Sequence, residues 1–151
     1  MLTVGDIAPD FELTSDEGEL VKLSDFRGQP LIIFFYPKAD TPGCTAQACG
    51  FRDNFEVIDA VNAAVLGISP DSPPKLAKWK KKQSLPYPLL SDPEHQVAET
   101  YGVWGEKKMY GRAYMGIIRS HFVVNEEGKI ADVQYKVSPK ESVARAVKFI
   151  S

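Results

Sequence analysis

Unbroken apolar runs and periodic apolar positions divide the chain into a small set of predicted elements. Residues 31–36 (LIIFFY) form a continuous apolar run between two prolines, and residues 64–68 (AVLGI) form a second one. A run without polar alternation predicts a strand that is covered on both faces. Between the runs, apolar residues recur at i, i+4 and i+7 and predict a helix over about residues 42–60. These apolar residues are Phe51, Phe55 and Ile58. The middle of the chain therefore predicts a parallel βαβ unit with a right-handed crossover.

The flanking segments predict shorter elements. Strands are expected at residues 11–13, 20–23, 87–90, 120–124 and 130–135, the last two as an antiparallel hairpin. Helices are expected to begin at Ser72, Asp92 and Ser138, each followed by a proline. Residues 105–116 are rich in glycine and lysine and are expected to form a loop over one end of the sheet. A βαβ half followed by a ββα half predicts an α/β chain with the thioredoxin-like fold, in which a central mixed β-sheet is flanked by helices on both faces.

The composition is that of an ordinary globular protein. The 151 residues are 44% hydrophobic and 25% charged, without repeats or linkers, so one domain over residues 1–151 is expected. The net charge of -2 gives no reason to expect nucleic acid or an anionic membrane as a partner. The apolar runs are too short to span a bilayer, and the N-terminus lacks a signal-peptide pattern. We therefore expect a cytoplasmic protein, in which two cysteines are more often chemical than structural.

One cysteine lies where the predicted helix begins. Thr41 is a preferred N-cap residue, and Pro42 suits the first helical position. Cys44 then falls in the first turn, near unpaired backbone N–H groups and the positive end of the helix dipole. A helix N-terminus favours the thiolate, which is the reactive form of cysteine. We interpret Cys44 as a nucleophile.

The second cysteine, Cys49, lies five residues further on. On a regular helix this spacing places the two Cα atoms about 8.6 Å apart. A disulfide needs less than about 7 Å, so the thiols can pair only if the first turns unwind. This suits a cycle in which a peroxide first oxidises Cys44 to a sulfenic acid and a second thiol then condenses with it.

The oxygen that leaves the peroxide needs fixed N–H donors or a cation. The backbone N–H groups of Gly43 and Cys44 are candidates. A side-chain cation is a second possibility, and spacing alone does not choose among Arg27, Arg52, Arg112 and Arg119.

Two other interpretations of the cysteines are weaker. They could be small buried hydrophobic residues, but a structural cysteine does not need a position behind Thr-Pro-Gly. They could also bind zinc together with His95 and His121. The cysteine spacing is wider than the usual C-x₂₋₄-C, and the histidines lie far apart in the sequence. We therefore expect no metal, with His95 at the surface and His121 on a strand with a hydrogen-bond partner.

Pro37, Thr41 and Cys44 form the pattern Pro-x-x-x-Thr-x-x-Cys. With this pattern and its neighbours the chain resembles the peroxiredoxins, and among them the bacterioferritin comigratory protein type, also called the Q type. The similarity covers essentially the whole chain. Its matching segments are residues 35–37, 41–53, 66–69, 89–92, 101–105 and 116–119.

The resemblance implies a role for each residue of the pattern. Cys44 would be the peroxidatic cysteine and Cys49 the resolving one, joined in an intramolecular disulfide. Thr41 would hydrogen-bond the peroxide, and Pro37 would shield the pocket. Arg119 matches the family arginine that holds the thiolate and the peroxide oxygens.

The resemblance also implies a reaction and its partners. Hydrogen peroxide or an alkyl hydroperoxide would be reduced to water or an alcohol. A dithiol protein such as thioredoxin or glutaredoxin would supply the electrons. No metal, haem or flavin cofactor is implied, and the protein would be a monomer.

Three positions depart from the family pattern. Gln47 stands where glutamate is common, and a neutral amide can hydrogen-bond an arginine but cannot form an ion pair. His121 replaces a small hydroxyl residue and Asn125 an aspartate, and both look structural. Trp104 and Tyr110 are expected to pack in the core rather than line the pocket.

Two other functions compete with peroxide reduction. One is a disulfide oxidoreductase on the same fold, which the wide cysteine spacing disfavours. The other is a redox-sensing interaction module or holdase whose helix unwinding a partner would read.

Overall fold

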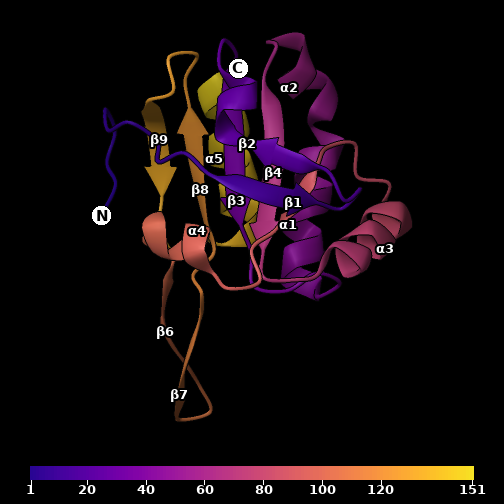
Figure 1. Cartoon of the computed structure of the whole chain (residues 1–151), viewed down its shortest axis with the longest axis vertical. Coiled ribbons are helices and arrows are strands. Elements are labelled where there is room, and N and C mark those ends of the chain that lie inside the picture. Colours follow the sequence, from indigo (N-terminus) through magenta and orange to yellow (C-terminus); the bar gives the residue numbers. More distant parts are fainter.

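Seven strands form one mixed sheet in the computed structural model, which describes residues 1–151 (Figure 1). The strand order is β2-β1-β5-β4-β3-β8-β9, with β3, β4 and β5 parallel to one another and the other pairs antiparallel. The sheet strands are β1 (Glu12–Ser15), β2 (Leu20–Lys22), β3 (Leu31–Phe35), β4 (Ala64–Ser69), β5 (Leu89–Ser91), β8 (Ser120–Val124) and β9 (Ile130–Gln134). The predicted mixed sheet and its βαβ unit are confirmed.

Helices cover both faces of this sheet. They are the 3-10 helix η1 (Leu23–Phe26) and the α-helices α1 (Pro42–Asp53), α2 (Phe55–Ala60), α3 (Pro73–Gln83), α4 (Gln96–Thr100) and α5 (Pro139–Ile150). None of them has the length and hydropathy needed to cross a bilayer. The last helix begins as predicted, because Ser138 Oγ accepts a hydrogen bond from the Glu141 backbone N–H at 3.3 Å.

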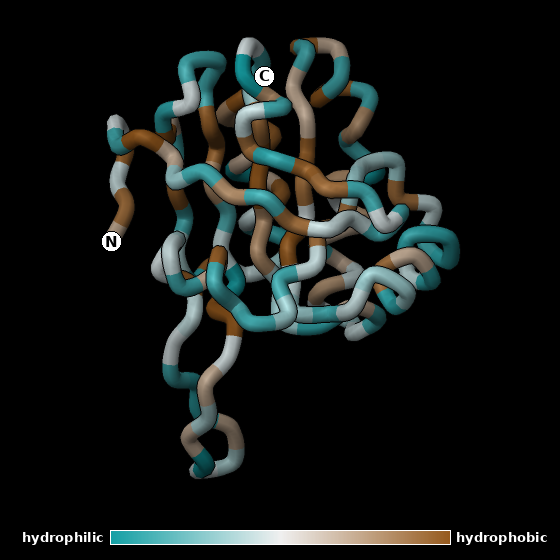
Figure 2. The backbone as a smooth tube through the Cα atoms, in the orientation of Figure 1, coloured by the Kyte–Doolittle hydropathy of each residue, from teal (hydrophilic) through white to brown (hydrophobic).

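The central strand β3 divides the core into two halves. Ile32 and Phe34 pack with residues of α1, α3 and α5 on one face of the sheet. Leu31, Ile33 and Phe35 pack with residues of α4, η1 and the N-terminal segment on the other face. All five are at most 1% exposed, and Figure 2 shows hydrophobic colouring along the central strands. The continuous apolar run is thus a strand covered on both faces, as predicted.

The helix predicted over residues 42–60 is divided in two, and that prediction was wrong in its length. Asn54 separates α1 from α2 with φ −103° and ψ 8°. Its side-chain Nδ2 donates to the Gly50 carbonyl at 2.8 Å, a bond that competes with continued helical pairing. Phe51 and Ile58 still bury completely against the sheet, and Phe55 packs at the edge of the same cluster.

Residues 105–116 form a β-hairpin, not the loop that composition predicted. Strands β6 (Trp104–Met109) and β7 (Arg112–Ile117) pair antiparallel and project from the body of the molecule (Figure 1). The turn residues Tyr110 and Gly111 both have positive φ, 52° and 76°, as a two-residue type I′ hairpin turn requires. Tyr110 is 98% exposed at the tip, so its predicted core position was wrong. Trp104 packs at the hairpin base, where its ring stacks on His95 at 3.7 Å.

Candidate active site

The loop after β3 delivers Cys44 to the start of α1. Thr41 is the N-cap, with extended φ and ψ of −106° and 155°, and Cys44 is the third residue of the helix. The Cys44 side chain lies in the core at 1% exposure. The backbone N–H groups of Gly43 and Cys44 belong to the first turn, which has no intrahelical acceptors, and they donate to no other group of the protein. These N–H groups can therefore bind an anion or a polarised oxygen.

The loop itself is held by contacts that the sequence did not reveal. Thr41 Oγ1 donates to the Lys38 carbonyl at 2.8 Å and does not cap the helix. The Ala39 backbone N–H donates to Asp71 Oδ2 at 2.7 Å, and Ser69 Oγ donates to the same oxygen at 3.0 Å. Asp71 lies two residues after the end of β4, at the carboxyl end of a parallel strand, where sites in such sheets are commonly found. Pro37 begins this loop and is half-buried.

Arg119 is the arginine that reaches Cys44. It lies between β7 and β8, and its Nη2 is 3.4 Å from the Cys44 sulfur. Its Nη1 donates to Gln47 Oε1 at 2.7 Å, so the amide orients the guanidinium without an ion pair. A Cβ at Gly43 would lie 3.1 Å from Nη2, so glycine leaves room for this approach.

The other three arginines lie elsewhere. Arg52 pairs with Asp53 at 2.9 Å, Arg112 is exposed on the hairpin, and Arg27 lies beside Gly128.

Cys49 lies further along α1 and contacts a different helix. Its thiol donates to Gln83 Oε1 at 3.4 Å, at the end of α3, and Arg52 Nη1 donates to the Gln83 carbonyl at 2.7 Å. Burial raises the pKa of the Cys49 thiol, and the nearby Arg52 partly opposes that shift. Both cysteines are free thiols on a wound helix. The structure therefore represents the dithiol form of the protein.

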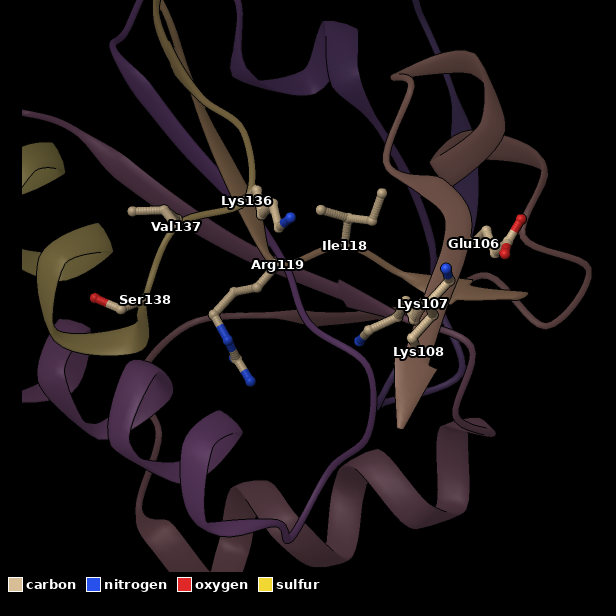
Figure 3. A pocket seen from close by; sticks show the side chains of 8 residues that line it. All are labelled: Glu106, Lys107, Lys108, Ile118, Arg119, Lys136, Val137 and Ser138. Carbon is tan, nitrogen blue, oxygen red and sulfur yellow. The ribbon is translucent and has the colours of Figure 1, made fainter. Parts of the chain in front are cut away.

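A basic pocket with a volume of about 690 Å³ opens beside Arg119. Figure 3 shows Arg119 and Lys136 on one side and Lys107 and Lys108 of β6 on the other. Lys107 Nζ donates to the Ile117 carbonyl at 2.8 Å. Burial lowers the pKa of Lys107, Arg119 lowers it further, and Cys44 raises it. Sequence reasoning missed Lys107 and Lys108 because residues 105–116 were expected to be a loop.

The four residues considered as zinc ligands do not form a cluster. No group of three or more histidine, cysteine or acidic side chains is arranged to hold a metal ion. His95 stacks on Trp104, whereas His121 is buried with its Nδ1 2.7 Å from Ser142 Oγ.

Comparison with known proteins agrees with this geometry. Residues 4–133 match the AhpC/TSA family. The chain is 54% identical to the Haemophilus influenzae protein bcp over 140 residues, 93% of this chain and 90% of that relative. It is 47% identical to peroxiredoxin Bcp of Bacillus subtilis over 147 residues, 97% of this chain and 94% of that protein. The Xanthomonas campestris bacterioferritin comigratory protein, described with an alkyl peroxide reduction activity, superposes with a TM-score of 0.89 at 30% identity, covering 99% of this chain and 96% of that one.

A thioredoxin-like fold with a buried thiol at a helix start, matched by these relatives, defines a thiol peroxidase. The chain belongs to the AhpC/TSA family, and within it to the peroxiredoxins of the bacterioferritin comigratory protein type. The fold and the enzyme class implied by the sequence are therefore confirmed.

Proposed function

We propose that Cys44 is the peroxidatic nucleophile and that Arg119 and the helix N–H groups stabilise its reaction. The observation that carries this assignment is the 3.4 Å contact between Arg119 Nη2 and the Cys44 sulfur. The thiolate attacks one peroxide oxygen, the O–O bond breaks, and the product is a sulfenic acid with release of water or an alcohol. The N–H groups of Gly43 and Cys44 bind the oxygens as charge develops. Thr41 Oγ1 accepts a hydrogen bond from the peroxide, and Pro37 shields the pocket.

Peroxide fits this site better than a protein disulfide does. At 1% exposure the Cys44 side chain can be reached by a small hydroperoxide but not by the sulfur of a folded protein. Disulfide exchange needs direct attack on the partner sulfur and is limited by access. The burial of Cys44 therefore favours peroxide reduction over general disulfide exchange.

Cys49 is the resolving cysteine in this proposal. Its thiol condenses with the Cys44 sulfenic acid, which forms the disulfide and releases water. On the wound helix the Cα atoms are separated by about 8.6 Å, too far for a disulfide. The first turns of α1 must therefore unwind, and Cys49 must leave Gln83, before the sulfurs meet.

The substrates are hydrogen peroxide and alkyl hydroperoxides, and the alkyl peroxide reduction activity described for the Xanthomonas campestris relative supports the second of these. A dithiol protein of the thioredoxin or glutaredoxin kind returns two electrons to the disulfide and restores both thiols. We propose that the enzyme works as a monomer without a cofactor in a reducing compartment such as the cytoplasm.

Mass spectrometry of the reduced protein after one equivalent of hydrogen peroxide tests these roles. The wild type should lose two hydrogens as the Cys44–Cys49 disulfide forms. Cys49→Ser should gain one oxygen in a single turnover, and Cys44→Ser should keep its mass. Two free thiols remaining in the treated wild type would contradict the proposal.

A further inference from the structure

A line of buried hydrogen bonds runs from Arg119 into the core. Arg119 Nη1 donates to Gln47 Oε1 at 2.7 Å, and Gln47 Nε2 donates to Ser142 Oγ at 3.0 Å. Ser142 Oγ lies 2.7 Å from His121 Nδ1. The residues behind Arg119 are 0% exposed and come from α1, α5 and β8. We propose that His121 and Ser142 are positioning residues for peroxide reduction. Acting through Gln47, they fix the guanidinium of Arg119 beside the Cys44 thiol.

The guanidinium fixes the direction of the bonds in this line as far as Ser142. Arginine only donates, so the carbonyl oxygen of Gln47 faces it and the amide NH₂ faces Ser142. Ser142 Oγ accepts a hydrogen bond from that amide. The hydroxyl proton of Ser142 then has His121 Nδ1 as its acceptor. With Nδ1 as that acceptor, the neutral His121 ring carries its proton on Nε2. A reversed amide would place donor against donor at Arg119.

Charged side chains on two neighbouring elements act electrostatically on the His121 ring. Asp132 on β9 has its Oδ2 3.7 Å from His121 Nε2, which is beyond hydrogen-bond distance. Arg145 on α5 is the other. Burial lowers the pKa of His121 to about 4, with Asp132 opposing and Arg145 adding to the shift. The ring therefore stays neutral at neutral pH, which leaves one of its nitrogens free to accept.

A role in packing alone does not explain these polar groups. An apolar side chain of similar size would fill the space of His121, and it would leave the buried Ser142 hydroxyl without an acceptor. The line is uncharged beyond Arg119, so it orients the guanidinium without neutralising it. The positive charge then remains available to the thiolate and to the peroxide oxygens. The close fit of the guanidinium against Gly43 means that a small displacement changes its contact with Cys44.

Two substitutions of His121 distinguish its role as a hydrogen-bond acceptor from a role in filling space. His121→Leu removes the acceptor, and His121→Asn supplies Oδ1 close to where Nδ1 lies. Single-turnover oxidation of Cys44 by hydrogen peroxide is followed by stopped-flow fluorescence. The rate at which iodoacetamide alkylates Cys44 is measured in parallel. We expect His121→Leu to lower the rate constant for oxidation by peroxide by about 10-fold to 100-fold, because misplacing a catalytic group slows a reaction by this much. The rate constant for alkylation should fall by less. His121→Asn should recover most of the loss.

Ser142→Ala interrupts the same line at its middle and should reproduce the loss. The double variant should lose no more than either single one, because the two residues act as one unit. Ser15→Ala is the matched control, since it removes a similarly buried hydroxyl from β1 and should leave the rate unchanged. If His121→Leu does not fold, Ser142→Ala decides the same question. A wild-type rate in the folded line variants, or no recovery in His121→Asn, would overturn the proposal.

The positioning role rests on the role proposed above for Arg119, and one more variant separates the two. Arg119→Ala should be at least as slow toward peroxide as His121→Leu. A wild-type rate in Arg119→Ala would refute the proposed role of the arginine itself. A slow Arg119→Ala beside fast line variants would refute only the inference about His121 and Ser142.

Discussion

Lowering the pH from 7 to 4 should weaken the fold through His121, because the protein holds this ring neutral. The side chain is 0% exposed, and burial lowers its pKa to about 4. The unfolded chain should have a histidine pKa of about 6.5. Between these two values the unfolded state binds a proton that the folded state does not. The stability contributed by the neutral ring is fully present above the pKa of the unfolded chain. It is lost as the pH falls from that value to the pKa of the folded protein.

The expected size of the effect follows from the shift in the pKa of His121. The difference between the pKa values of the unfolded and the folded protein corresponds to about 3 kcal/mol in the free energy of unfolding. For a domain of this size that lowers the melting temperature by about 6–12 °C. Below the folded pKa both states are protonated, and this contribution changes no further.

Urea unfolding of the reduced protein between pH 7.5 and pH 4 measures this contribution. The fluorescence of Trp79, which is 2% exposed, should report unfolding. The matched variant is His121→Asn, which keeps an acceptor for Ser142 but does not titrate. The wild type should lose about 3 kcal/mol more than the variant over this range. Parallel pH profiles for the two proteins would refute the assignment of a neutral His121.

Two further substitutions test contacts around the two cysteines. Asp71→Ala removes the acceptor of the Ala39 N–H and should destabilise the protein by about 1.5–3 kcal/mol, the value of a hydrogen bond to a charged group, as urea unfolding measures. Its peroxide rate should also fall, and an unchanged rate would show that the loop does not need this anchor. Gln83→Ala removes the acceptor of the Cys49 thiol and should speed disulfide formation after oxidation, as stopped-flow fluorescence measures. A slower resolving step would mean that Gln83 guides Cys49 rather than retains it.

The central elements could be predicted from local pattern alone. The run at residues 31–36 became a strand at the middle of the sheet because its side chains alternate between two apolar cores. The break at Asn54 and the hairpin at residues 104–117 were missed for different reasons. A side-chain bond to a carbonyl four residues earlier ends α1, and periodicity does not register it. In the hairpin, exposure on both faces removes the alternation that marks a half-buried strand.

The same distinction between local and distant contacts decides which parts of the site could be predicted from the sequence. The helix start at Cys44 depends on a few neighbouring residues and was predictable. Arg119 and Gln47 are separated by 72 residues, and Gln47 and Ser142 by 95. Periodicity carries no information about such pairs. The family resemblance selected Arg119, whereas nothing in the sequence joined His121 to Gln47.

In the cycle that we propose, the two steps place opposite requirements on α1 at Gln47. Gln47 lies between Cys44 and Cys49, and its contacts with Arg119 and Ser142 hold the first turns of the helix wound. Peroxide attack needs that arrangement, because the guanidinium must stay beside the sulfur. Disulfide formation needs the same turns to unwind, which breaks a charge-assisted bond of about 1.5–3 kcal/mol and a neutral one of about 1 kcal/mol. The buried line therefore favours the first step at the expense of the second, and its strength sets how long the sulfenic acid persists before Cys49 reaches it.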